Sequence, residues 1–146
     1  MSLLKKLKAS KNEMKHSSRG IFLYEKRKPT KMLKGGHGER NIQYLQKNHL
    51  SYKINDIDAN GVRHGQIACH KRPQEQQPRG HVWFPSNWDD SKIAAAGEHV
   101  ANLKKNAKAP DHSPMHGSYR GVQVVSYKSR GRICGICPKF KQKKGK

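Results

Sequence analysis

Hydrophobic and polar positions follow a helical period in two parts of the chain. After the glycines of "KGGHGER", Ile42 and Leu45 share one face, which predicts a short helix over residues 39–48. Further on, apolar residues three or four positions apart predict a helix with one narrow apolar face: Ile93, Ala96, Val100 and Leu103. Asp89 or Asp90 can cap this helix, because an aspartate at a helix N-terminus accepts backbone N–H groups and suits the helix dipole.

Other stretches have the pattern of β-strands. Residues 51–70 predict a hairpin, since apolar and polar residues alternate and Asn60-Gly61 is a favoured tight-turn pair. Two more strands are predicted on either side of a turn near residues 129–131, with these candidate core residues: Val122, Val124, Ile133 and Ile136. The apolar run Ile21–Tyr24 is too short to fold alone but can add an edge strand. The order helix, hairpin, helix, hairpin indicates an α+β domain with a small antiparallel sheet and two or three helices.

Both tryptophans lie just before the second predicted helix, in "HVWFPSNWDD". Phe84 and Trp88 resemble an apolar plug that fixes the angle at which the chain begins a helix, so structural anchoring is the favoured interpretation of both. Trp83 has two candidate roles. If its ring is exposed, it can stack on a nucleobase, as aromatic residues beside basic ones do. Packing in the core is its alternative role.

Most of the positive charge lies at the two ends of the chain. The chain has 146 residues, 33% hydrophobic, with a formal net charge of +21. Residues 1–35 hold eleven Lys and Arg against two acids, and residues 128–146 hold eight against none. Low hydrophobicity with like charge disfavours collapse. We therefore expect a basic, partly disordered leader over residues 1–34, a folded domain over 35–140 and a basic tail over 141–146.

A leader and a tail of this charge attract phosphate polyanions such as nucleic acids. The alternatives are that they aid solubility or bind anionic surfaces without specificity. No segment is long or apolar enough to be a signal peptide or to span a bilayer, so we predict no membrane span. Three cysteines without a paired framework favour synthesis in a reducing cytoplasm, and the sequence does not show whether the protein is later exported.

Histidine is unusually frequent, with nine residues in a chain that has ten acids. Imidazole is the side chain best suited to moving protons near neutral pH, and RNA cleavage without a metal needs a base, an acid and a cation. His37 lies among glycines before a helix, and His70 lies in "CHKRP" at the end of a predicted strand. Each is a candidate catalyst, with an ordinary surface histidine as the alternative.

The cysteines suggest a zinc or redox site as an alternative to a catalytic site of histidines. Cys134 and Cys137, in "CGIC", have the spacing of a zinc knuckle or a redox pair, and Cys69 with His70 could complete a Cys₃His site. Residues three apart in a flat strand point to opposite faces, so chelation would need a turn at Gly135. Buried, packed thiols are the favoured alternative.

Four segments, in order, resemble the bacterial EndoU-type nuclease domain of polymorphic toxins and phage-associated proteins: "GGHGERNIQYL", "NGVRHGQIACHK", "WFPSNWDDSKIAAAGEHVANL" and "YRGVQVVSYKSRGRICGICP". The resemblance covers roughly residues 34–140. It implies an α+β fold of the barnase, EndoU, colicin and RelE-like group. It also implies cofactor-free cleavage of RNA to a 2′,3′-cyclic phosphate, and, for a toxin, an acidic immunity protein that covers the basic cleft.

The resemblance implies site residues at matching positions. His37 and His70 would carry protons, and either Lys71 or His81 would be the cation that supports the phosphate. The implied substrate-binding residues are Trp83, Arg72, Arg79, Ser86 and Gly135. The chain departs from the family pattern at Gly135, which lacks a hydroxyl, and at Cys137, which replaces an aromatic residue. A nucleic-acid-binding module without catalysis, or a small zinc-binding structural protein, are the alternatives.

Overall fold

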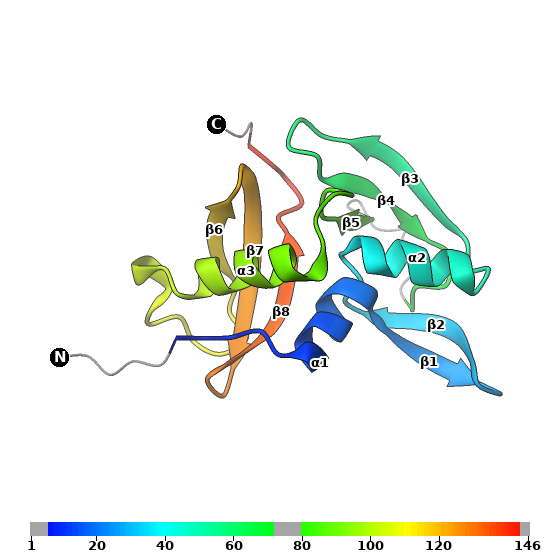
Figure 1. Ribbon diagram of the computed structural model, residues 1–146, viewed down its shortest axis with the longest axis horizontal. Helices are drawn as coiled ribbons and strands as arrows, with labels where there is room; N and C mark the ends of the chain where they lie inside the picture. The colour runs from blue at the N-terminus through cyan, green and yellow to red at the C-terminus, as the bar shows by residue number, and fades with distance from the viewer. Residues whose placement is uncertain (1–5, 72–79, 144–146) are drawn as a thin grey trace.

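A computed structural model describes residues 6–71 and 80–143, which form two halves that meet at the centre of the molecule (Figure 1). In one half, helix α3 lies against an antiparallel sheet of order β6-β7-β8. These elements are α3 (Asp90–Ala101), β6 (Met115–Tyr119), β7 (Val122–Ser129) and β8 (Arg132–Pro138). A 3-10 turn, η3 (Lys104–Asn106), connects α3 to β6.

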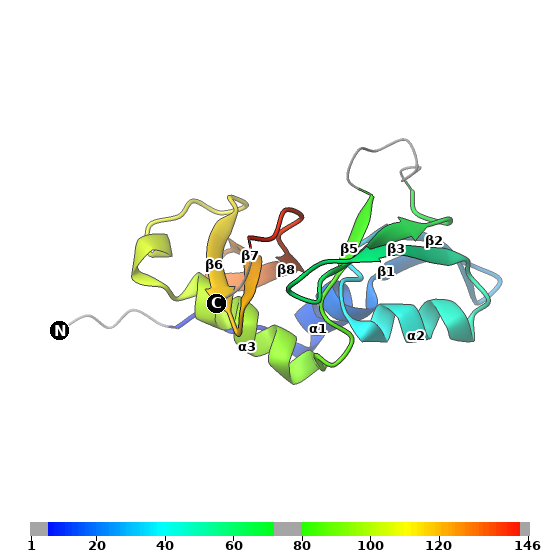
Figure 2. The same cartoon turned by 90° about the horizontal axis from the view of Figure 1, so that it is seen from above.

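In the other half, helix α2 covers a two-stranded sheet, β1-β2, and a three-stranded sheet, β3-β4-β5, as the view from above shows (Figure 2). These elements are α2 (Glu39–Lys47), β1 (Ile21–Glu25), β2 (Lys28–Lys34), β3 (Tyr52–Ile57), β4 (Arg63–Ile67) and β5 (His81–Trp83). Near the junction of the halves lie the short helix α1 (Lys11–Met14) and the π-helical turn η1 (Lys15–Arg19). The α+β class is confirmed, with three small antiparallel sheets instead of one.

Helix α3 forms as its sequence predicts. Asp89 is the N-cap, and its carboxylate accepts a hydrogen bond from the backbone N–H of Lys92 at 2.9 Å. Ile93, Ala96 and Val100 are buried against the β6-β7-β8 sheet, as are Val122, Val124, Ile133 and Ile136 of the predicted strands. The predicted helix is slightly too long, because Leu103 lies after its end and only partly buries its side chain.

The segment before α3 is an anchor of the core. Phe84 and Trp88 are buried, and their rings stack with centroids 5.3 Å apart. Trp83 is fully buried, and its Nε1–H donates to Asn41 Oδ1 at 2.9 Å. The expectation that Trp83 stacks on a base is therefore not met, because its ring is covered by the cluster of Phe22, Met32, Ile42, Leu45 and Ile67.

The first part of the chain differs from the expected solvated leader. Residues 11–34 form α1, η1 and the β1-β2 hairpin, although the sequence predicts only an edge strand here. Met14 is buried in the core of one half, and Phe22 and Met32 are buried in the core of the other. These few apolar residues are enough to hold the segment, while lysines such as Lys11 and Lys15 stay exposed.

The end of the described chain is also attached to the domain. Gln142 donates to the Gln123 carbonyl oxygen at 2.8 Å, and Asn60 donates to the Lys143 carbonyl oxygen at 2.6 Å. Residues 72–79, within the stretch 71–80 that the sequence predicts to be a loop, and the last three residues lie outside the described residues. Within the described residues, no helix is long and apolar enough to cross a membrane.

Strand β6 is a further difference, since the sequence around it reads as a polar loop. Met115 is fully buried, whereas His116 and Ser118 are exposed. Gly117 faces the end of α3, where a Cβ atom would lie 3.0 Å from the Val100 side chain and 2.7 Å from that of Leu103, just after the helix. A glycine at an inward position removes the apolar side chain that would have shown the alternation.

Candidate functional site

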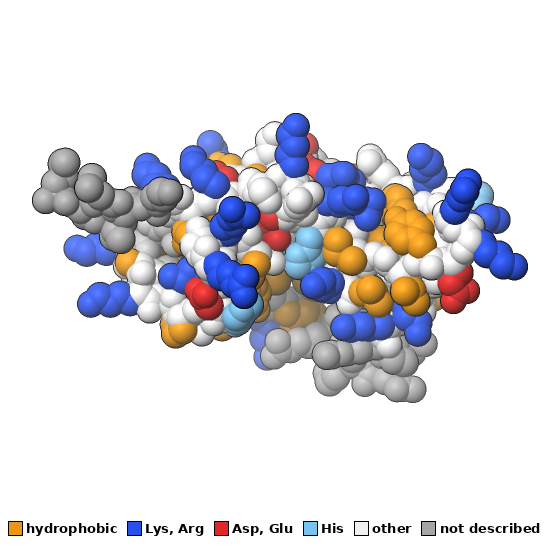
Figure 3. All heavy atoms as spheres, turned by 90° about the horizontal axis from the view of Figure 1, so that it is seen from below, with side chains coloured by type: hydrophobic (Ala, Val, Ile, Leu, Met, Phe, Trp, Pro, Cys, Tyr) orange, Lys and Arg blue, Asp and Glu red, His pale blue; other side chains and the backbone are white. Residues whose placement is uncertain are grey.

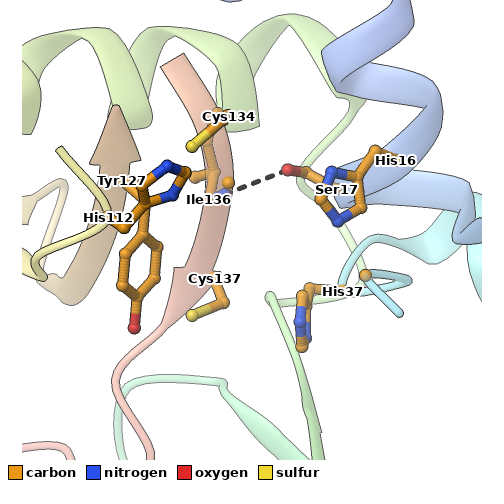
Figure 4. A pocket seen from close by; sticks show the side chains of 10 residues that line it. His16, Ser17, His37, His112, Tyr127, Cys134, Ile136 and Cys137 are labelled. Carbon is orange, nitrogen blue, oxygen red and sulfur yellow. Dashed lines mark hydrogen bonds between the residues drawn. The ribbon is translucent and has the colours of Figure 1, made fainter. Parts of the chain in front are cut away.

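A pocket with a volume of about 230 Å³ lies between the two halves of the molecule (Figure 4). One wall is formed by His16, Ser17, Gly35 and His37. The opposite wall is formed by His112, Tyr127 and residues 134–137. Seen from below, histidine side chains lie at a hollow between the halves, and Lys and Arg side chains are spread around it (Figure 3). The pocket therefore combines imidazoles with a positively charged surface.

Backbone hydrogen bonds bring His16 and His37 to the same wall. The N–H groups of Gly36, His37 and Gly38 donate to the carbonyl oxygens of residues 16, 17 and 18 at 3.0, 2.6 and 3.0 Å. This close approach needs glycine at position 35, because a Cβ atom there would lie 2.0 Å from the His16 carbonyl oxygen. Gly35 also has φ +73°, a left-handed conformation that suits glycine.

His37 is held with one ring nitrogen available. Its Nδ1 lies 2.8 Å from the Val82 carbonyl oxygen, so Nδ1 carries the proton and Nε2 keeps its lone pair. The backbone carbonyl of His37 accepts a further bond from Phe84 N at 2.7 Å. Burial lowers the pKa of His37 from 6.5 to about 4. His37 is therefore a neutral imidazole near pH 7, which can accept a proton at Nε2.

His16 has a carboxylate partner. Its Nδ1 lies 3.3 Å from Glu13 Oε1, and Glu13 is buried. The Ser17 hydroxyl donates to Glu13 and accepts a 3.0 Å bond from the backbone N–H of Ile136, drawn as the dashed line in Figure 4. Glu13 thus orients the ring with Nδ1 protonated, as a carboxylate does for histidine in acid–base sites.

His81 lies behind His37 and contacts two of the predicted residues. Its ring stacks on His37, with centroids 4.7 Å apart and planes within 4°, and lies 6.2 Å from the His70 ring. His81 is only 4% exposed, and its Nε2–H donates to the Gly36 carbonyl oxygen at 2.7 Å. Burial keeps the pKa of His81 well below its ordinary value. The expectation that His81 is the phosphate-binding cation is therefore not met, because the ring is neutral and covered.

The other predicted site residues are less close to the pocket. The His81 ring lies beside the rings of the two predicted catalysts, stacked on His37 and 6.2 Å from His70. His70, however, is not among the residues that line the pocket. Lys71 is exposed, and its backbone N–H donates to the Met32 carbonyl oxygen at 2.9 Å. Arg72 and Arg79 lie outside the described residues.

Two predicted substrate-binding residues have different surroundings. Gly135 lines the pocket, on the wall opposite His37. Ser86 is exposed and lines a separate hollow with Glu39, Arg40 and Asp89. The pocket with the histidines therefore includes position 135 but not position 86.

The cysteines do not form the Cys₃His site that the sequence allowed. Cys134 and Cys137 line the pocket, whereas Cys69 packs against the separate core around Trp83. Burial raises the pKa of Cys134, and it raises the pKa of Cys137 to about 12, so both are thiols near neutral pH. Across residues 6–71 and 80–143, no group of three or more His, Cys, Asp or Glu is placed to hold a metal ion.

The fold and the pocket together define an α+β protein with a pocket lined by histidines. The bacterial EndoU nuclease family matches residues 15–139, and the protein therefore belongs to this family. No curated protein and no solved structure matches the chain. The family match begins at Lys15, so it includes His16, which lies within the predicted leader of residues 1–34.

A local signal for His16 was present in the sequence. In "SKNEMKH", Ser10 and Glu13 have the spacing of a capping box, and Ser10 does cap α1 by accepting a bond from the Glu13 N–H at 3.1 Å. Glu13 and His16 are then three residues apart, which places them on one helical face. The net charge of the segment obscured this short amphipathic pattern.

The lowered pKa of His37 predicts a pH dependence of stability. Unfolded His37 takes up its proton near pH 6.5, but folded His37 does so only near pH 4. Between these values the unfolded chain binds more protons, so the free energy of unfolding should fall as the pH is lowered through this window. The fall from this residue should be about 2 kcal/mol between pH 7 and pH 5. Urea denaturation at pH 7.0, 6.0 and 5.0 should show a weaker fall for His37→Gln than for the wild type. Equal falls would contradict the prediction.

Proposed function

We propose that this nuclease cleaves RNA by transesterification and leaves a 2′,3′-cyclic phosphate, with His37 as general base and His16 as general acid. The observation that carries the proposal is the placement of both imidazoles on one wall of a single pocket, each with Nδ1 held by an oxygen. Their Nε2 atoms are then the groups available for proton transfer. This assignment replaces the expected pair of His37 and His70 with His37 and His16.

The proton positions set the two roles. Neutral His37 takes the 2′-hydroxyl proton at Nε2, and the 2′ oxygen attacks the adjacent phosphorus. The bond from phosphorus to the 5′ oxygen breaks as protonated His16 gives a proton to that oxygen. His37 ends as an imidazolium and His16 as a neutral ring, so the proton count balances. Glu13 fixes the orientation of the His16 ring by pairing with Nδ1.

A cation near the phosphate would complete the site. His81 is neutral, so we assign this role to Lys34, which directly precedes Gly35 of the pocket and is exposed. The positive charge of Lys34 also acts on Cys134 of the opposite wall. Lys71, beside His70, is the alternative cation. Such a charge offsets the negative charge that builds on the phosphorus oxygens.

The proposal predicts a specific product from a specific substrate. Purified protein in EDTA should convert end-labelled RNA to fragments with 2′,3′-cyclic phosphate and 5′-hydroxyl ends, because the imidazoles supply both proton transfers. The same sequence as DNA should remain intact, since it lacks the 2′-hydroxyl. Gel electrophoresis with acid treatment, which opens cyclic phosphates, checks both results. Cleavage of DNA at a similar rate would contradict the proposal.

A nucleic-acid-binding module without catalysis is the second candidate. Gly135, which has no hydroxyl to offer a substrate, and the net charge of +21 favour it. RNA that binds but stays intact over hours, with the wild type and His37→Ala indistinguishable, would support this candidate over the nuclease.

The biological setting is a proposal as well. Action as a cytoplasmic toxin, with or without export, fits a basic nuclease domain, and its partner would be an acidic immunity protein that covers the pocket. Loss of RNA cleavage on adding such a protein at equal concentration would be the direct test.

A further inference from the structure

The position of Gly135 has a consequence for the neighbouring strand. In the antiparallel pair β7-β8, Gly135 lies directly opposite Tyr127. A Cβ atom on Gly135 would lie 3.3 Å from Tyr127 Cδ1, so the tyrosine ring occupies the face that a side chain at position 135 would cover. The loss of a side chain on β8 therefore makes room for a ring from β7.

The Tyr127 ring is part of the pocket. Tyr127 is half-buried and lines the same pocket as His16 and His37. In Figure 4 its ring lies on the wall opposite His37, with the hydroxyl end beside Cys137. Burial raises the pKa of Tyr127 above its ordinary value, so its hydroxyl keeps its proton near pH 7 and can donate a hydrogen bond.

Among the described residues, Ser17 and Tyr127 line this pocket with a hydroxyl, and of these two the Tyr127 hydroxyl is available to hydrogen-bond a ligand. The Ser17 hydroxyl donates to Glu13 and accepts from Ile136 N–H, which leaves it committed to the fold. The Tyr127 hydroxyl has no hydrogen-bond partner among the residues that the structure describes. It is a protonated donor that faces a pocket lined by His16, His37 and His112.

We propose that Tyr127 is a substrate-binding residue whose hydroxyl donates a hydrogen bond to a phosphate oxygen of the bound RNA. This inference rests on the proposed ribonuclease function, because the phosphate must lie between His37 and His16 for the reaction. Gly135 acts indirectly by leaving space for the ring.

Tyr127→Phe tests the hydroxyl while it keeps the ring. Removal of a hydrogen bond to a charged oxygen should lower kcat/KM for RNA cleavage about tenfold to a hundredfold. It should also weaken the binding of a 2′-O-methyl oligonucleotide, which cannot react, by about tenfold. The melting temperature should stay within about 2 °C of the wild type, since the hydroxyl has no partner in the folded chain.

Tyr119→Phe is the matched control. Tyr119 is also a half-buried strand tyrosine, but it packs near Trp88 and does not line the pocket. This variant should cleave and bind as the wild type does. If Tyr127→Phe cleaves and binds RNA as well as Tyr119→Phe, the inference is overturned, while the ribonuclease function stands. If the wild type does not cleave RNA, the proposed function fails, and unchanged binding of the 2′-O-methyl oligonucleotide by Tyr127→Phe then overturns this inference separately.

Discussion

Replacement of His16 or His37 with alanine is expected to lower kcat/KM for RNA cleavage by about a hundredfold to ten-thousandfold. Each change removes from the pocket wall an imidazole to which we assign a proton transfer. Because the two residues act in the same step, His16→Ala with His37→Ala should be little worse than the more damaging single change. Initial rates of cleavage of a fluorescent oligoribonucleotide below saturation give the three values.

The control must separate loss of chemistry from loss of structure. His116→Ala removes an exposed imidazole on β6, outside the residues that line the pocket, and should leave the rate unchanged. Glu13→Gln should lower the rate less than His16→Ala, since it weakens the orientation of His16 without removing its ring. If His16→Ala cleaves RNA at the wild-type rate while His37→Ala does not, His16 is not the general acid and His70 becomes the next candidate.

The pH profile distinguishes the two roles further. A general base with a pKa of about 4 stays unprotonated through mildly acid pH, so the acidic limb of kcat/KM should lie near pH 4 instead of near 6.5. A limb with its midpoint near pH 6.5 would mean that His37 is not the base. The measurement can be made above the pH at which the protein unfolds, since only the absence of a decline between pH 7 and pH 5.5 is needed.

Much of the fold could be predicted because its signals are local. Helix α3 carries its cap and its apolar face within one segment, and the β3-β4 and β7-β8 hairpins each have a recognisable turn. Residues 11–34 are harder to predict, because their burial depends on contacts with distant parts of the chain. Met14 is buried only because α3 and β8 lie beside it, and net charge alone does not reveal this.

The site was predictable in part for the same reason. His37 stands in a glycine-rich segment that marks a close backbone approach, and this approach does occur, but against η1. His16 and Tyr127 come from segments far apart in sequence, and only the fold brings them to one pocket. Trp83 shows the converse: an aromatic residue in a basic sequence was fully buried, because its indole N–H finds a partner in Asn41.

Gly35 lies where the segment that carries His37 contacts the segment that carries His16. Gly35→Ala would place a methyl group 2.0 Å from the His16 carbonyl oxygen and 2.5 Å from its ring carbon Cδ2. Relief of this contact must move η1 away from residues 36–38 and separate His16 from His37. We expect at least about a hundredfold loss of kcat/KM, as for removal of His16 itself, and a lower free energy of unfolding.

Gly131→Ala separates the steric contact from the cost of backbone conformation. Gly131 has φ +76°, close to the +73° of Gly35, but an added Cβ atom would have no heavy atom within 4 Å. Both variants should lose about 1–2 kcal/mol of stability from the left-handed conformation, and only Gly35→Ala should lose more than this and also lose activity. Chemical denaturation and cleavage rates measured on the same samples decide the matter. Equal activity of the two variants would show that the hydrogen-bonded contact between residues 36–38 and η1 does not set the distance between the catalytic imidazoles.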